Sequence, residues 1–168
     1  LQTAAYFIVS SLKRRNLVQE LQKRSYNVLH ALSVDYLSIY QVNFDTGKCE
    51  MYRDSEQIPV HWEDGYQTAM EQYISRCVSP RDQERLRAVT QKDYVLAQLR
   101  KRKKFYARYL VKENPYGLNH LEIHFSSTGK REEENCVIFA LRDVNAVVEQ
   151  EEKYKLEARK SLEDILEG

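Results

Sequence analysis

The chain has 168 residues, which is enough for one domain with helical extensions, and its 42% hydrophobic and 30% charged residues are typical of a globular protein. A net charge of +1 excludes a global field that would select a nucleic acid or a membrane surface. Three cysteines at long spacings, with no CxxC pair, argue against structural zinc and favour a reducing cytoplasm.

Residues 1–32 are predicted to form an N-terminal helical extension. Leu17, Leu21, Val28 and Leu32 fall on one helical stripe, and polar and charged residues occupy the other positions. Such a stripe can pack on its own domain or on a partner helix. We expect it to support a homodimer formed through the flanking helices.

An apolar run at residues 4–9 precedes the basic sequence Lys13-Arg14-Arg15. This order is found where a membrane helix enters the cytoplasm, but the run is far shorter than the roughly 20 residues needed to span a bilayer. We therefore expect a helix face with a basic flank, in a cytoplasmic domain whose membrane anchorage depends on residues before Leu1.

The next segment is predicted to be a β-hairpin. Residues 36–44 (YLSIYQVNF) alternate and are rich in aromatic and branched side chains, and residues 48–53 form the returning strand. Asp45-Thr46-Gly47 between them is a turn, because Gly supplies a positive φ. Both alternating sets of residues 36–44 contain apolar side chains, so the face that turns inward stays open.

Three short helices are predicted to follow the hairpin. The first covers residues 62–78, and Pro80 begins the second with Ser79 as its N-terminal cap. Thr90 is predicted to cap the third, with Asp93 three positions further on.

The period then returns to two, which predicts three more strands at residues 105–111, 120–125 and 135–141. In the middle strand, apolar side chains occupy one face while His120, Glu122 and His124 share the other. The order of elements predicts an α+β fold, with helices on one face of a five-stranded antiparallel sheet and helices at both ends.

Four segments, in this order and at this spacing, resemble parts of the PAS family of sensor domains over residues 33–145. They are the hairpin DYLSIYQVNFDTGKCEMYR, the helix start Val78-Ser-Pro-Arg-Asp-Gln-Glu-Arg-Leu86, the strand Phe105-Tyr-Ala-Arg-Tyr109, and the closing Arg142-Asp143-Val144-Asn145. Ser79 stands where the family usually has His, and Asn145 stands in place of Thr.

The resemblance implies a PAS-like sensor domain at 33–145 between an N-terminal extension, 1–32, and a C-terminal signalling helix, 146–168. It is closest to PAS domains of multidomain bacterial signalling proteins, such as diguanylate cyclases (GGDEF) and the sensor histidine kinases of two-component systems. The implied function is to bind a small ligand or partner and to relay its state to an output domain outside this chain. The alternative is a ligand-free dimerisation or spacer module.

The candidate relay residues are Arg142, Asp143 and Asn145. A carboxylate at a helix N-terminus accepts backbone N–H bonds and suits the positive end of the helix dipole. Asp143 can also pair with a cation such as Arg142, and a ligand that shifts the sheet would alter that pairing. The plain alternative is a helix cap with no switching role.

The candidate ligand-binding residues are polar side chains able to reach a pocket: Tyr40, Tyr73, Tyr109 and His124. The ligand itself is unknown. Haem and flavin are disfavoured, because the nearest His, His61, lies in a loop and no flavin-photosensor string (Asn-Cys-Arg-Phe-Leu-Gln) occurs.

No metal site is predicted, because two His four positions apart on a strand lie about 13 Å apart at roughly 3.3 Å per residue. The basic run Arg100–Lys104 spans a helix end, where cations are favoured, so no nucleic-acid partner is expected. The chain has no GxSxG, Walker, GxGxxG or HExxH sequence, and we expect no catalysis in it.

Overall fold

The computed structural model describes residues 10–24, 34–58, 60–128 and 135–167. The chain divides into two compact units, Leu1–Asp35 and Tyr36–Gly168, and each is considered by itself. Within the described ranges, no helix is long and apolar enough to cross a membrane.

The first unit contains a helix over residues 10–24. Of the predicted apolar stripe, Leu17 and Leu21 lie in this helix with 58% and 54% of their surface exposed. Val28 and Leu32 fall outside the described residues. The helix therefore presents the first half of the stripe to its surroundings.

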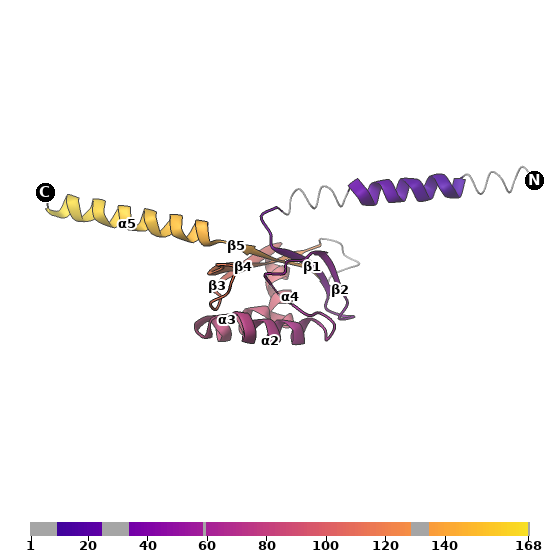
Figure 1. Ribbon diagram of the computed structural model, residues 1–168, viewed down its shortest axis with the longest axis horizontal. Coiled ribbons are helices and arrows are strands. Elements are labelled where there is room, and N and C mark those ends of the chain that lie inside the picture. The colour runs from indigo at the N-terminus through magenta and orange to yellow at the C-terminus, as the bar shows by residue number, and fades with distance from the viewer. Residues whose placement is uncertain (1–9, 25–33, 59, 129–134, 168) are drawn as a thin grey trace, which may run out of the picture. The chain divides into compact units, whose positions relative to one another are not determined.

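The second unit is built on an open antiparallel sheet with the strand order β2-β1-β5-β4-β3 (Figure 1). The strands are β1 (Ser38–Asn43), β2 (Cys49–Arg53), β3 (Lys104–Leu110), β4 (His120–Ser127) and β5 (Cys136–Asp143). The predicted α+β class and five-stranded antiparallel sheet are confirmed. Because β5 pairs with both β1 and β4, the opening hairpin and the last three strands form a single sheet.

Three helices lie on one face of this sheet (Figure 1). They are α2 (Tyr66–Cys77), α3 (Pro80–Thr90) and α4 (Lys92–Lys101). The core forms between them and the sheet, and it is strongly aromatic, with Tyr73 of α2 and Phe125 and Phe139 of the strands among its fully buried members. Burial of side chains of this size stabilises the fold by about 1.5–3 kcal/mol each.

The structure settles which face of the first strand turns inward. Tyr40 and Val42 are fully buried and belong to the core, so Ile39 and Gln41 face away from the helices. In β4, Ile123 and Phe125 point inward as predicted.

Two predicted helix starts are wrong. The first helix begins at Tyr66 rather than at residue 62, because Gly65 adopts φ 84° and a left-handed residue cannot continue a right-handed helix. Thr90 does not cap α4: it is the last residue of α3, and its hydroxyl donates to the Leu86 carbonyl at 2.8 Å. Ser79 does precede α3, but its side chain makes no capping hydrogen bond.

The last strand continues further than predicted. β5 runs through Asp143, because Arg142 and Asp143 remain paired with residues of β4. Helix α5 (Asn145–Glu167) then begins after a single intervening residue, Val144, whose side chain is buried. This short connection ties the orientation of the first turn of α5 to the end of the sheet.

Candidate functional site

A carboxylate is buried on the sheet face that points away from helices α2, α3 and α4. The side chain of Glu122, in the middle of β4, is only 1% exposed. The sheet register places Arg108 of β3 directly opposite it on one side and Arg142 of β5 on the other. Directly opposed side chains on a sheet lie close enough to interact, so the pairing of three strands assembles the cluster.

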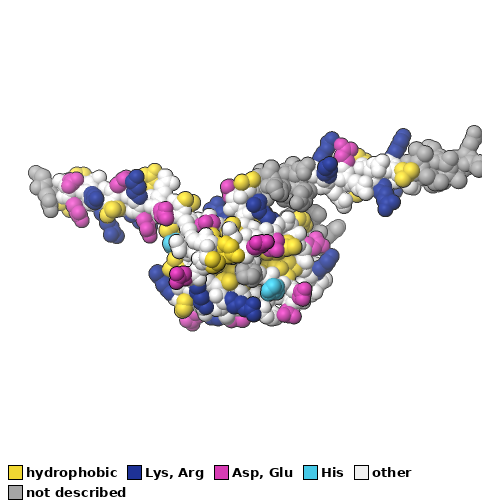
Figure 2. Space-filling model, viewed as in Figure 1, with side chains coloured by type: hydrophobic (Ala, Val, Ile, Leu, Met, Phe, Trp, Pro, Cys, Tyr) yellow, Lys and Arg dark blue, Asp and Glu magenta, His cyan; other side chains and the backbone are white. Residues whose placement is uncertain are grey.

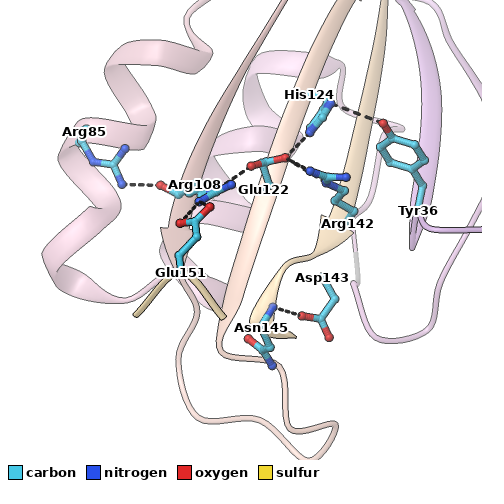
Figure 3. Close-up of polar contacts among 9 residues, drawn as sticks. All are labelled: Tyr36, Arg85, Arg108, Glu122, His124, Arg142, Asp143, Asn145 and Glu151. Carbon is cyan, nitrogen blue, oxygen red and sulfur yellow. Dashed lines mark hydrogen bonds and ion pairs between the residues drawn. The ribbon is translucent and has the colours of Figure 1, made fainter. Parts of the chain in front are cut away.

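Glu122 accepts hydrogen bonds from three side chains (Figure 3). Arg108 Nε donates to Glu122 Oε2 at 2.7 Å, and Arg142 Nε donates to Oε1 at 2.9 Å. Arg142 Nη2 forms an ion pair with the same Oε1 at 2.7 Å. His124 Nε2 also contacts Oε1. Burial by itself would raise the pKa of Glu122, but the hydrogen bonds from Arg108, His124 and Arg142 outweigh it, and the pKa lies below its ordinary value.

Arg108 joins this cluster to the C-terminal helix. Its Nη1 donates to both carboxylate oxygens of Glu151 on α5, at 3.0 and 2.8 Å. The hydrogen bonds to Glu122 and Glu151 raise the pKa of Arg108 above its ordinary value. Two guanidinium groups therefore face two carboxylates, and the formal charges of the network balance. Arg108 is thus bonded both to the buried carboxylate of the sheet and to a carboxylate of α5.

Helix α3 reaches the same arginine from the other side. Arg85 donates to the backbone carbonyl of Arg108 at 2.6 Å (Figure 3). It also pairs with Asp82 at 3.0 Å. The second carboxylate oxygen of Asp82 accepts the backbone N–H of Leu110 at 2.8 Å. Burial opposes ionisation of Asp82, yet the bonds from Leu110 and Arg85 leave its pKa below the ordinary value. The position of β3 is thus fixed from α3 as well as from α5.

His124 sits between two tyrosines. Its ring stacks on Tyr106 with a centroid distance of 5.7 Å and meets the edge of Tyr36 at 5.5 Å. Tyr36 Oη lies 3.5 Å from His124 Nδ1, at the outer limit of a hydrogen bond. A tautomer with its proton on Nε2 satisfies both polar contacts, since Nε2 then donates to Glu122 and Nδ1 accepts from Tyr36.

The predicted relay residues form a second connection between the sheet and α5. Asp143 Oδ1 accepts the backbone N–H of Asn145 at 2.9 Å. Asn145 Oδ1 accepts the backbone N–H of His120 at 2.7 Å, and its Nδ2 donates to the Gly117 carbonyl at 3.2 Å. The predicted pairing of Asp143 with Arg142 is wrong, because Arg142 turns to Glu122 instead. Figure 3 shows the two residues pointing in different directions.

The four predicted ligand-binding residues separate into two places. Tyr40, Tyr73 and Tyr109 are buried in the core between sheet and helices, whereas His124 lies on the opposite face of β4. The hydroxyls of Tyr73 and Tyr109 are 2.7 Å apart, and Tyr40 Oη donates to Asp54 at 3.1 Å. Burial raises the pKa of Tyr40 to about 12, so its hydroxyl remains a donor.

A cavity of about 210 Å³ lies at one end of this aromatic core. It is bounded by the C-terminal end of α2, by the loop between β3 and β4, and by Ile58 before α2. Tyr73 is the one predicted ligand residue among the residues that line it. Among the described residues, no group of three or more His, Cys, Asp or Glu side chains could hold a metal ion.

Three residues of this network were not predicted as site residues: Glu122, Arg108 and Glu151. An acidic residue between two histidines is a visible signal in His120-Leu-Glu-Ile-His124, but it is equally compatible with an exposed polar face. The partners of Glu122 become apparent only when the strand register is known.

The chain matches no family model, and no curated protein gives a significant match to it. The functional conclusion therefore depends on the geometry of the two connections to α5 and of the cavity.

Proposed function

We propose that this chain is a PAS-like sensory domain that binds a small ligand or partner and relays its state through α5 to an output domain. The sheet with helices on one face is the architecture that the resemblance implies. The four segments that carry the resemblance form the β1–β2 hairpin, the start of α3, strand β3, and the junction of β5 with α5, and this order of elements supports the proposal.

The observation that carries the proposal is the connection of α5 to the sheet through polar contacts. From Glu149 to Leu166 every side chain of α5 is exposed, including large apolar ones such as Leu162 and Ile165. Basic, acidic and apolar side chains lie together along the helix in view (Figure 2). A helix held at its first turns by Asn145 and Glu151, and free beyond them, is suited to changing its direction or its partner.

A ligand acts on such a helix only by favouring one of two arrangements over the other. In the proposed relay, one arrangement keeps Arg108 bonded to both Glu122 and Glu151, and the other releases Glu151. In both arrangements the start of α5 is fixed by the same three residues, Arg142, Asp143 and Asn145. The proposed output is a diguanylate cyclase (GGDEF) or histidine kinase domain, and no catalytic role is proposed for the chain itself.

A second candidate function is a dimerising spacer that holds no ligand in its core. Tyr40, Tyr73 and Tyr109 are each at most 2% exposed and hydrogen-bonded, so the space between sheet and helices is packed. The packed centre of the domain leaves no room for a ligand and favours the spacer function. The cavity at the end of the core favours the sensory function. In both functions we propose a homodimer formed through the exposed flanking helices.

The proposed function is tested by joining the chain, after Glu167, to the catalytic domain of a diguanylate cyclase in several helical registers. Cyclic di-GMP formation is then compared for Glu151→Gln and for the neighbouring Glu152→Gln, which removes an equal charge outside the network. We expect Glu151→Gln to change the basal rate severalfold in at least one register, with Glu152→Gln matching the parent. Equal rates for both variants in every register would contradict the relay.

A further inference from the structure

The cavity at the end of α2 has an apolar interior. Ile58, Cys77, Leu118 and Leu121 are among its walls. The hydroxyl of Tyr73, also in its lining, is already hydrogen-bonded to the hydroxyl of Tyr109 at 2.7 Å. The volume of about 210 Å³ is smaller than the roughly 300–1,000 Å³ of pockets for drug-sized ligands. A molecule that fits would be small and would place an apolar body in this interior.

The rim of the cavity carries an excess of positive charge. Arg76 is exposed and forms no ion pair with any described residue. Lys112 is held in place because its Nζ donates to the Ser75 carbonyl at 2.7 Å. Glu113 is the one acidic residue among the described lining, so two cations face one carboxylate. A free guanidinium beside an apolar cavity favours a ligand with an anionic end, since planar carboxylates bind it through two hydrogen bonds.

We propose that this cavity is the ligand site of the domain and that its ligand is a small organic acid, with the apolar body inside and the carboxylate at Arg76. This proposal rests on the proposed sensory function and adds to it the chemical class of the ligand. It also assigns the site to the end of the core rather than to its packed centre.

The loop that contributes part of the cavity wall is hydrogen-bonded to the start of α5. Asn114 organises the loop between β3 and β4: its Nδ2 donates to the carbonyls of Lys112 and Leu118 at 2.9 and 2.7 Å. The next residues of the loop, Pro115 and Tyr116, line the cavity. The carbonyl of Gly117 in the same loop accepts from Asn145 Nδ2 at 3.2 Å. A ligand that moves this loop therefore acts on the first residue of α5 without passing through the core.

The test uses the full chain and three probes of matched size: hexanoate, hexan-1-ol and hexylamine. We expect calorimetry to show saturable binding of hexanoate, about fivefold tighter than hexan-1-ol and tighter still than hexylamine. Arg76→Gln should remove the preference of the protein for the acid over the alcohol. Arg100→Gln, an exposed arginine outside the cavity, should leave all three affinities unchanged. Because Arg76 pairs with no carboxylate in the described part of the chain, its variant is expected to fold normally.

The coupling is read by NMR on the same samples. We expect hexanoate to shift the amide signals of Gly117 and of the first turns of α5, and Asn145→Ala to keep the binding but to remove the response of α5. The ligand assignment is overturned if hexanoate does not saturate, if it binds no better than hexan-1-ol, or if Arg76→Gln has no effect. The coupling is overturned if α5 is unresponsive or still responds in Asn145→Ala. After either failure, the Glu151 comparison in the cyclase fusion still tests the relay independently.

Discussion

Arg108 of β3 and Glu151 of α5, 43 positions apart in the sequence, are joined by hydrogen bonds of 2.8 and 3.0 Å. The same guanidinium is bonded to the buried Glu122, so a single side chain connects the middle of the sheet to the second turn of the C-terminal helix. An exposed ion pair by itself contributes little to stability. Its significance here is that one of its members is fixed by a buried carboxylate.

Glu122→Gln is expected to destabilise the fold by about 2–3 kcal/mol. Removing one member of a fully buried ion pair costs about 3–5 kcal/mol, and the two arginines, about a third exposed, recover part of that through water. Urea unfolding measures the change. Glu113→Gln, an exposed carboxylate outside this cluster, is the matched control and should differ from the parent by less than about 0.5 kcal/mol. Equal stability of the two variants would show that the cluster around Glu122 does not stabilise the fold.

The stabilisation by Glu122 is expected to depend on pH. Because the pKa of Glu122 is lowered in the folded protein, the unfolded chain binds its proton first as the pH falls. The contribution is complete above the ordinary Glu pKa of about 4.3 and is lost as the pH falls through the lower folded value. The difference in stability between the parent and Glu122→Gln should therefore be constant above about pH 5 and shrink below it. A difference that persists unchanged at pH 3 would contradict the lowered pKa.

The buried hydroxyl pair of Tyr73 and Tyr109 is expected to give a non-additive mutant cycle. Tyr73→Phe or Tyr109→Phe leaves the other hydroxyl buried without a partner and should cost about 1–2 kcal/mol. The double variant removes both polar groups, so its loss should be smaller than the sum of the two single losses. Thermal or urea unfolding of the four proteins checks this, and strictly additive losses would mean that the hydroxyls do not interact.

The side chain of Asn145 is expected to protect the loop between β3 and β4. Its Oδ1 accepts the backbone N–H of His120, so Asn145→Ala should raise hydrogen exchange at that amide about tenfold. Asn119 is exposed and lies one position before His120, so Asn119→Ala serves as the control. Unchanged exchange at His120 in Asn145→Ala would show that this hydrogen bond is not formed in solution.

The proposed dimer is expected to depend on the N-terminal helix. Leu21 is 54% exposed on the face predicted from the sequence, and Leu21→Glu should leave a folded monomer where the parent sediments as a dimer. Lys23→Glu, on the same helix but off the apolar stripe, controls for the added negative charge. A dimer that survives Leu21→Glu would place the interface elsewhere.

Periodicity predicted the sheet well, because each strand has one face in the core and the alternation of side chains follows from that burial. The same periodicity also indicates that His124 and the buried tyrosines lie on opposite faces of the sheet. With Ile123 and Phe125 pointing inward, His124 must point to the opposite face. His124 and the buried tyrosines Tyr73 and Tyr109 therefore cannot line one pocket, and the ligand-binding role of each stays a prediction.

The burial of Glu122 could not be predicted in the same way. Its neighbours along the chain indicate an exposed polar face, and its stabilising partners lie 14 and 20 positions away on two other strands. Register between strands depends on loop lengths and on pairing across the whole sheet, which one strand does not reveal. The two helix starts were predicted wrongly for local reasons. Gly65 adopts a positive φ and so delays the start of α2, and the Thr90 hydroxyl donates to a carbonyl of its own helix instead of capping the next one.

The most direct test of the relay is hydrogen exchange along α5 in the parent and in Glu122→Gln. Glu122 belongs to β4, and among the described residues no hydrogen bond or ion pair joins its side chain to α5. The account predicts that losing this carboxylate releases Arg108 from its fixed position and raises exchange severalfold in α5 around Glu151. If exchange increases in β4 and its neighbouring strands while α5 keeps the rates of the parent, the sheet and the helix are not coupled and the proposed relay is contradicted.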